Sequence, residues 1–338
     1  MGMKNRGFGV GIIGTGGCMP QKTLTNHNME ELITDTSDDW IVKRTGIHER
    51  RFLEETESVR PLAVRAAVEA LEDAGVKPSQ IGMIIASTST PEYLCPPLSS
   101  VIQHQICAEK CAAFDINAAC TGFIYALSAA EGFITTGMCE YVLIICAESL
   151  SKTIDFKHRS SGILFGDGAG AAVVGKVGEG FGILRSTLGA DGEGGNLITI
   201  PCLYHTDEDA EIRAGRRINS VWLHGSQVMK FASRIMSSCI EELLEMSGKR
   251  LEEVDLIIPH QANIRIIENS VKRIGADMEK VFVNLHKYGN MSSASLPVAV
   301  NEASREGRLS YGDVIIIVAF GGGLTYGAHL IRWGKQKA

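Results

Sequence analysis

Four runs of apolar residues mark the buried strands that the chain predicts. IGMIIAS (81–87) and YVLIICAES (141–149) lie in the first half, and DLIIPH (255–260) and DVIIIVAFG (313–321) lie in the second. Continuous rather than alternating apolar runs are typical of strands with helices on both faces. Helical patterns follow in TGFIYALSAAEGFITTG after residue 120 and in SLPVAVNEASREG from residue 295. The pattern therefore predicts an α/β protein.

The strands recur at a nearly constant spacing. A helix end, a short loop and a strand follow one another in the same order twice, with strand entry at Ile81 and Val254, so that 254 − 81 = 173. Val142 and Val314 begin the next pair of strands, and 314 − 142 = 172. A spacing kept over about sixty residues indicates a duplicated α/β half. Two such halves should bring their strand ends together around one cleft.

Length and composition agree with two halves. The 338 residues exceed the roughly 250 to 300 at which a single core stops growing, and we expect an N-terminal half over 1–180 and a C-terminal half over 181–338. The net charge of −6 disfavours a nucleic-acid partner. No run of 18 apolar residues and no signal-peptide pattern is present, so we expect no membrane partner and a cytoplasmic protein.

Nine cysteines, most of them within apolar runs, indicate buried free thiols rather than a disulfide framework. Cys107 and Cys111 are spaced to share one side of a helix, but no Cys-x-x-Cys motif or histidine pair completes a metal-binding set. We therefore expect no metal site.

The residues able to do chemistry lie at the predicted strand ends. Cys120 begins a helix, where the helix dipole and free N–H groups are expected to lower the thiol pKa. His260 follows a buried strand at the position of Ser87 in the first half. Asn290 comes 290 − 120 = 170 positions after the cysteine and is roughly its counterpart in the repeat. The glycines 321–323 can present N–H groups to an oxyanion.

Each of these features alone has an ordinary structural explanation: an inert core thiol, a satisfied histidine, a turn asparagine or a tight connection. Because all four fall at strand ends of the two halves, the sequence favours a single active site built from both.

The chain also resembles a known family in several long strings. DTSDDWIVKRTGIHERR, DINAACTGF, FGDGAGAAVV, PHQAN, YGNMSSAS and FGGG are similar to those of β-ketoacyl-acyl carrier protein synthase III, a thiolase-fold condensing enzyme. The resemblance runs over nearly the whole chain. It implies a homodimer of thiolase-like, five-layered αβαβα subunits, each built from two duplicated halves.

The resemblance implies an acyltransferase that initiates fatty acid synthesis. Such an enzyme takes an acyl group from acyl-coenzyme A and condenses it with malonyl-acyl carrier protein, with loss of carbon dioxide, to give 3-ketoacyl-acyl carrier protein. Acyl-coenzyme A is a substrate, and no resident cofactor is expected.

Site residues are implied by the same resemblance. Cys120, His260 and Asn290 form the catalytic triad, Gly322 and the cysteine supply N–H groups to the thioester oxyanion, and Phe320 lies near the leaving carboxylate. The other implied residues are Thr36, Trp40, Arg44 and Arg159 at coenzyme A, with Trp40 and Arg159 around the adenine; Arg265, Lys272 and Arg273 at the carrier protein; and Cys95 in the acyl pocket. Many acetyl-selective members have phenylalanine where this chain has Cys95, so longer or branched primers are expected to be accepted.

Other functions fit parts of the sequence. A starter-unit or secondary-metabolite synthase of the same family is the main alternative, and a hydroxymethylglutaryl-type synthase is disfavoured because we can place no further glutamate motif. A scaffold that only binds acyl-coenzyme A and a cysteine hydrolase are also possible. Glycines 9, 11 and 14 match a dinucleotide-binding pattern, although no helix is expected to follow them.

Overall fold

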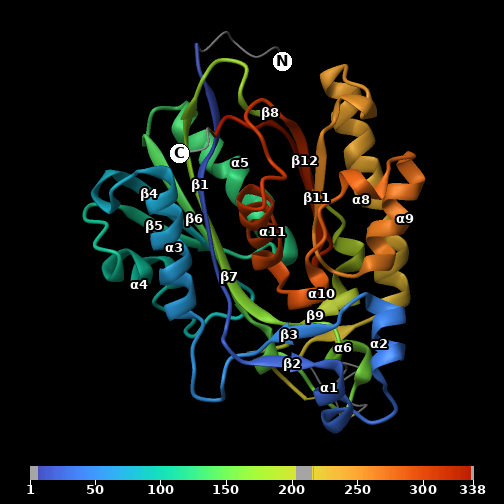
Figure 1. Cartoon of the computed structure of the whole chain (residues 1–338). Helices are drawn as coiled ribbons and strands as arrows, with labels where there is room; N and C mark the ends of the chain where they lie inside the picture. The colour runs from blue at the N-terminus through green and yellow to red at the C-terminus, as the bar shows by residue number, and fades with distance from the viewer. Residues whose placement is uncertain (1–6, 203–214, 216, 336–338) are drawn as a thin grey trace.

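The first of two large sheets has five strands. The computed structural model describes residues 7–202, 215 and 217–335 (Figure 1). The strand order is β1 (Gly9–Cys18), β7 (Asp167–Val177), β6 (Tyr141–Ser149), β4 (Ile81–Ser87) and β5 (Ala112–Ile116). β4 pairs in parallel with β5 and β6, and β7 runs antiparallel to β1 and β6. The two apolar runs of the first half are therefore neighbouring parallel strands, as predicted.

The second large sheet has four strands. Their order is β11 (Leu256–Pro259), β12 (Val314–Gly321), β13 (Thr325–Arg332) and β8 (Gly182–Ala190). β11 and β12 are parallel, and β13 is antiparallel to both of its neighbours.

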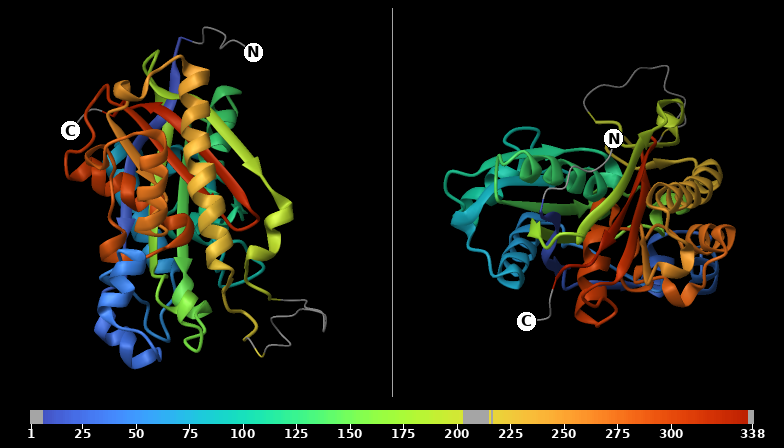
Figure 2. Two further views of the ribbon diagram at one scale, coloured as in Figure 1. Left: turned by 90° about the vertical axis from the view of Figure 1, so that its right-hand side faces the viewer. Right: turned by 90° about the horizontal axis from the view of Figure 1, so that it is seen from above.

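Helices cover both faces of each sheet and complete five layers, visible from above in Figure 2. α3 (Arg60–Ala74) and α4 (Leu98–Gln105) lie on the outer face of the first sheet, and α8 (Gly225–Ser247) covers that of the second, with α9 (Ile264–Ile274) packed against it. α5 (Gly122–Thr135) and α11 (Ser295–Arg305) lie between the sheets. The predicted αβαβα fold is confirmed.

Separate apolar cores fill these layers. One lies between the sheets and includes Phe123, Leu296 and Ile317, a second lies under α3 and α4, and a third lies under α8 and α9. The strands β4, β6, β11 and β12 therefore bury both of their faces, which explains the continuous apolar runs.

The duplication is visible in the short elements as well as the strands. α3 ends at Gly75 (φ 64°) and α8 ends at Gly248 (φ 65°), and 248 − 75 = 173. Each helix is followed by a 3-10 turn and then by a buried strand. The remaining 3-10 elements include η2 (Ala119–Thr121) and η7 (Ser292–Ala294), which begin at residues 173 apart, since 292 − 119 = 173. The repeat predicted from two strands therefore extends to turns and caps.

Smaller elements gather at one end of the molecule, at the bottom of Figure 1. They are β2 (Thr23–Thr25), α1 (Asn26–Leu32), α2 (Asp38–Thr45), β3 (Glu49–Arg51), α6 (Arg159–Gly162), β9 (Ile198–Thr199) and α10 (Leu285–Tyr288). Further short elements of the chain are η3 (Leu150–Thr153), η4 (Gly192–Leu197) and β10 (Trp222–Leu223). The 3-10 helices η1 (Pro78–Gln80), η5 (Leu251–Glu253) and η6 (Met278–Lys280) lie elsewhere.

The glycines of the dinucleotide-like pattern lie inside a strand. Gly9, Gly11 and Gly14 all belong to β1, which pairs along its length with β7. A Cβ at Gly14 would lie 2.4 Å from the Ala70 carbonyl oxygen, so glycine is required there by the close packing of α3. The context of a phosphate-binding loop is absent, and this alternative is wrong.

In the part of the chain that the structure describes, we find no helix with both the length and the apolar character needed to span a bilayer.

Candidate active site

Two equivalent turns, one from each half of the repeat, lie at the candidate active site. η2 and η7 lie in contact, and each begins at a non-glycine residue in the left-handed region, Ala119 (φ 46°) and Ser292 (φ 47°). The structural counterpart of Cys120 is therefore Ser293, because both are second in their turns. The sequence-based pairing of the cysteine with Asn290 is wrong by three positions, and Asn290 instead corresponds to Asn117.

The cysteine turn packs directly against the end of β12. A Cβ on Gly321 would lie 2.7 Å from the Cys120 backbone nitrogen, closer than real contacts allow. The Thr121 hydroxyl donates to Thr325 Oγ1 at 2.8 Å, and Thr325 Oγ1 donates to the Gly322 carbonyl at 3.1 Å. These contacts hold the glycine loop beside the N–H groups of the cysteine turn.

Burial controls the ionisation of the cysteine. Burial, with a smaller contribution from the nearby Glu148 carboxylate, raises the pKa of the Cys120 thiol to about 12, although hydrogen bonds from the Ser292 side chain and from its own N–H act to lower it. The expected lowering of this pKa by the helix start is wrong for the resting protein. Desolvation of the thiolate outweighs the favourable N–H groups.

His260 is a neutral, unpaired hydrogen-bonding group. It follows β11, is 1% exposed, and donates its backbone N–H to Val318 O at 2.8 Å. Burial lowers the pKa of His260 to about 3. Neither ring nitrogen has a hydrogen-bond partner among the described residues, and the ring meets Phe320 edge to face at 5.6 Å between centroids.

Asn290 is fixed by its backbone and by its side-chain oxygen. Its N–H donates to Leu164 O at 2.8 Å, and its carbonyl accepts from Gly166 N at 3.0 Å. Its Oδ1 accepts from Ser292 N at 2.8 Å, which leaves the Nδ2 group as the donor end. Asn290 therefore presents a neutral donor from the turn that faces Cys120.

The sequence analysis missed a buried carboxylate. Glu148, at the end of β6, is fully buried and accepts hydrogen bonds from Ser293, Ser89 and Thr90. Burial raises the pKa of Glu148, and these donors lower it. An acidic residue that closes the otherwise apolar run YVLIICAES was the signal available in the sequence.

The residues expected at coenzyme A gather around Trp40 on α2. The Arg159 guanidinium carbon lies 4.5 Å from the centre of the Trp40 ring, and that of Arg44 lies 5.3 Å away. The buried Thr36 hydroxyl has no partner within the described part of the chain. Arg159 lies directly on the indole, so a base entering between the two would have to displace it.

The residues expected at the carrier protein all lie on α9. Arg265 is tied back to α2 by a hydrogen bond from its Nε to Lys43 O at 3.1 Å. Lys272 and Arg273 are exposed and, with Lys230 and Arg234 of α8, line a hollow of about 620 Å³. The exposed faces of α8 and α9 thus share a positively charged surface.

Cys95 is exposed in the loop after β4, next to Tyr93 (56% exposed) and Leu94 (72% exposed). The apolar side chains of this loop project from the subunit surface.

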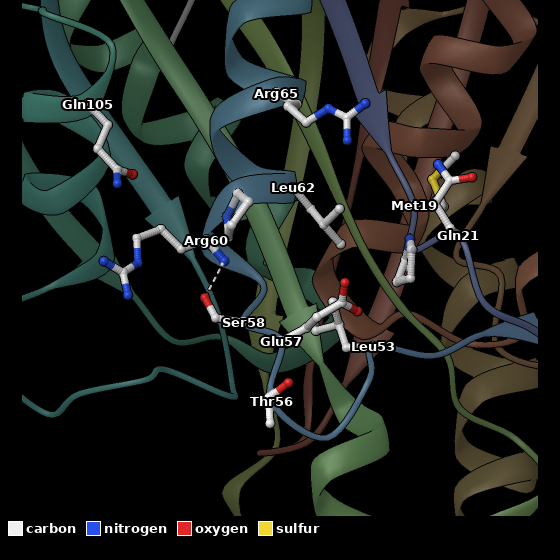
Figure 3. Close-up of a pocket in the computed structure, with 12 residues that line it drawn as sticks. Met19, Gln21, Leu53, Thr56, Glu57, Ser58, Arg60, Leu62, Arg65 and Gln105 are labelled. Carbon is white, nitrogen blue, oxygen red and sulfur yellow. Dashed lines mark hydrogen bonds between the residues drawn. The ribbon is translucent and has the colours of Figure 1, made fainter.

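A separate hollow of about 470 Å³ opens at the start of α3 (Figure 3). Arg60, Arg65 and Leu62 of α3 line it together with Met19 and residues of the loop before the helix. None of the residues expected in the active site lines this hollow.

Comparisons with known proteins agree with the arrangement. The family described as 3-oxoacyl-[acyl-carrier-protein] synthase III matches residues 114–192, and its C-terminal part matches residues 244–333. The chain is 46% identical over 327 residues to beta-ketoacyl-[acyl-carrier-protein] synthase III of Desulfitobacterium hafniense strain Y51, covering 97% of this chain and 98% of the relative. It is 46% identical over 326 residues to the protein of that name from Caldanaerobacter subterraneus, covering 96% and 98%.

The fold is similar to that of a solved structure as well. The crystal structure of 3-oxoacyl-[acyl-carrier-protein] synthase III from Aquifex aeolicus VF5 superimposes with a TM-score of 0.88 at 43% identity, covering 96% of this chain and all of that one.

Proposed function

Because the chain belongs to the β-ketoacyl-[acyl-carrier-protein] synthase III family of acyltransferases, we propose that Cys120, His260 and Asn290 carry out the condensation that initiates fatty acid synthesis. The substrates proposed are an acyl-coenzyme A primer and malonyl-acyl carrier protein. The comparisons do not favour the starter-unit alternative.

The first half-reaction loads the enzyme. The Cys120 sulfur attacks the primer thioester, the new carbon–sulfur bond replaces the bond to coenzyme A, and the coenzyme A thiol leaves with the proton that the cysteine gives up. Negative charge develops on the thioester oxygen during this step. The N–H groups of Cys120 and Gly322 are proposed to stabilise it, and one such donor is typically worth about 10²- to 10³-fold in rate.

The second half-reaction forms the carbon–carbon bond. Malonyl-acyl carrier protein loses carbon dioxide, and the electron pair of the broken bond forms an enolate on the thioester. His260 and Asn290 Nδ2 are proposed to donate hydrogen bonds to the enolate oxygen, and the apolar Phe320 ring lies beside His260. The carbanion then attacks the acyl-cysteine, which expels the Cys120 thiolate, and that thiolate recovers a proton.

One observation supports this assignment above the others. His260 is buried, neutral and without a partner at either ring nitrogen, and Asn290 has its oxygen engaged and its amide nitrogen left to donate. Two neutral donors suit an enolate, whereas a carboxylate at either position would repel it.

Release of carbon dioxide from malonyl-acyl carrier protein tests the proposal. The wild-type protein with an acyl-coenzyme A primer should release carbon dioxide and form 3-ketoacyl-acyl carrier protein. His260→Ala and Asn290→Ala should each slow release by about 10²-fold or more while Cys120 still accepts the primer. Hydrolysis of acyl-coenzyme A without any condensation product would contradict the proposal.

Further parts of the assignment follow from the same family membership. We propose that Trp40, Arg44, Arg159 and Thr36 bind coenzyme A, and that Arg265, Lys272 and Arg273 meet the acidic carrier protein. Residues 1–180 and 181–338 are proposed as the two halves, with the protein acting as a cytoplasmic homodimer without a resident cofactor. All nine cysteines are free, which is in keeping with a reducing compartment.

A further inference from the structure

The Glu148 carboxylate accepts hydrogen bonds from Ser89, Thr90 and Ser293, none of which is a cation. Its Oε2 accepts from Ser89 N and Thr90 Oγ1, both at 3.0 Å. Its Oε1 accepts from Ser293 Oγ at 2.6 Å and from Ser293 N at 3.4 Å. Each oxygen therefore faces one backbone N–H, which can only donate.

Glu148 joins the two halves of the protein, because Ser293 donates from the second half while Ser89 and Thr90 donate from the first. Ser89 and Thr90 belong to the loop after β4, Glu148 closes β6, and Ser293 lies in η7 of the second half. Thr90 Oγ1 accepts from Ser149 N at 2.8 Å, so the threonine must direct its own proton to Glu148. The orientation of the carboxylate is thus fixed from both sides.

The turn held by Glu148 carries part of the active site. Asn290 Oδ1 accepts from Ser292 N, one residue before Ser293, so the position of η7 determines where the Asn290 amide points. The Ser292 side chain also hydrogen-bonds to Cys120. Ser293 itself occupies the place in its turn that Cys120 occupies in η2.

We propose that Glu148 is a positioning residue for the condensation reaction, because its carboxylate fixes the η7 turn, which holds the Asn290 side chain, against the loop after β4. The inference rests on the proposed function, since Asn290 acts there as the enolate donor. Glu148 is fully buried, and its effect is expected to be larger on decarboxylation than on primer loading.

Glutamine is the sharpest substitution. Its amide has nearly the shape of the carboxyl group but replaces one acceptor oxygen with a donor NH₂ group. Whichever way it is turned, that group faces a backbone N–H, either that of Ser89 or that of Ser293. The turn must then shift or leave a buried donor without a partner.

The experiment measures the two half-reactions separately in Glu148→Gln. Primer loading is followed by intact mass in a single turnover with acyl-coenzyme A, and decarboxylation is followed by carbon dioxide release from malonyl-acyl carrier protein. Glu148→Gln should lose about tenfold or more in decarboxylation, because loss of a full oxyanion donor costs about 10²- to 10³-fold. Primer loading should fall far less than decarboxylation, because η2 and the glycine loop keep their own contacts and η7 reaches Cys120 only through the Ser292 hydrogen bond.

Asp73→Asn is the matched control. The Asp73 carboxylate also accepts a backbone N–H, from Thr15 at 2.7 Å, but it lies on the outer helix α3. The Asp73→Asn variant should carry out both half-reactions at the wild-type rate. Ser293→Ala removes the 2.6 Å hydrogen bond to Glu148 and should give the same selective loss of decarboxylation to a smaller degree. This variant tests the positioning role of Glu148 if Glu148→Gln does not fold.

Equal loss of both half-reactions in a folded Glu148→Gln protein, or rates like those of Asp73→Asn, would overturn this inference alone. A wild-type protein that releases no carbon dioxide from malonyl-acyl carrier protein would instead overturn the proposed function.

Discussion

Burial sets the protonation of the two ionisable side chains assigned to catalysis. The pKa of Cys120 is raised to about 12 and that of His260 is lowered to about 3, so both groups are neutral near pH 7. The site therefore differs from a cysteine–histidine ion pair, in which a low thiol pKa and a protonated imidazole support each other. Neutral donors suit the enolate chemistry, and the thiol must give up its proton during the attack itself.

The raised thiol pKa predicts the pH dependence of alkylation at Cys120. Because only the thiolate reacts, labelling by iodoacetamide should rise about tenfold per pH unit between pH 7 and 9 without reaching a plateau. Peptide mapping would separate Cys120 from the exposed Cys95, Cys107 and Cys202. A plateau below pH 8 would show instead that the thiol pKa is lowered.

His260 predicts a pH dependence of stability. Its pKa is about 3 in the folded protein and near 6.5 when unfolded, so between these values only the unfolded chain binds the proton. Its contribution to the free energy of unfolding is thus full above pH 6.5 and falls as the pH drops, by up to about 1.4 kcal/mol per unit. His260→Gln should remove this slope in denaturant titrations between pH 4 and 6. Equal slopes for variant and wild type would refute this role of His260. His329 and the buried carboxyl groups are present in both proteins, so their contributions to the slope cancel in the comparison.

The identities of the candidate catalytic residues could be predicted from the sequence, but the ionisation of their side chains could not. Cys120 and His260 were found as candidates because each follows an apolar run, and Asn290 was found through its spacing from the cysteine in the repeat. The thiol pKa was predicted in the wrong direction because the sequence shows the helix start but not how completely the surrounding layers exclude water. Glu148 was missed because its partners, Ser89 and Ser293, are far apart in the chain.

At the scale of elements, the contact between β12 and η2 is the tightest constraint on the site. A Cβ on Gly321 would meet the backbone nitrogen atoms of Cys120 and Thr121 at 2.7 and 3.2 Å. Gly321→Ala should therefore displace the cysteine turn, slow primer loading by about tenfold or more and destabilise the fold by about 1–3 kcal/mol. Loading measured by intact mass and unfolding by denaturant would check both effects.

Gly132→Ala is the control for that substitution. Gly132 lies in α5, and its added Cβ would meet nothing within 4 Å, so alanine should preserve loading and raise helix stability slightly. If Gly321→Ala loads primer as fast as Gly132→Ala, the close packing of η2 on β12 does not position the nucleophile.

The order of helices and strands could largely be predicted from the sequence, but one pairing of residues between the halves was wrong. Strands with both faces covered give continuous apolar runs, and the 173-residue spacing of Ile81 and Val254 fixed the register of the halves. The pairing of Cys120 with Asn290 failed because it matched residues by chemistry rather than by that spacing. The turns η2 and η7 show the true equivalence, through the left-handed residues Ala119 and Ser292.

At the scale of the whole molecule, the loop that carries Cys95 links assembly to primer choice. Its apolar side chains, Tyr93 and Leu94, are exposed on the isolated subunit, as expected for a surface that a second copy covers. In the proposed homodimer we expect this loop to contribute Cys95 to the partner's acyl pocket. The pattern of apolar residues in one chain cannot predict such a surface, because it does not show which side chains stay exposed after folding.

Cys95→Phe tests this link. A larger side chain in the pocket should reduce kcat/KM for branched or longer acyl-coenzyme A primers by about tenfold or more and spare acetyl-coenzyme A, because overfilling a packed site is costly. Sedimentation of wild type and variant should show dimers in both cases. An unchanged ratio of branched to acetyl primers would place Cys95 outside the acyl pocket.

The most direct measurement of the central claim is intact mass combined with product detection, for wild type and for Cys120→Ala. With acyl-coenzyme A the wild-type protein should gain the mass of one acyl group, lose it when malonyl-acyl carrier protein is added, and yield 3-ketoacyl-acyl carrier protein. The variant should show neither the acyl adduct nor the product. Condensation at the wild-type rate by Cys120→Ala, or an adduct mapped to another residue, would contradict the account.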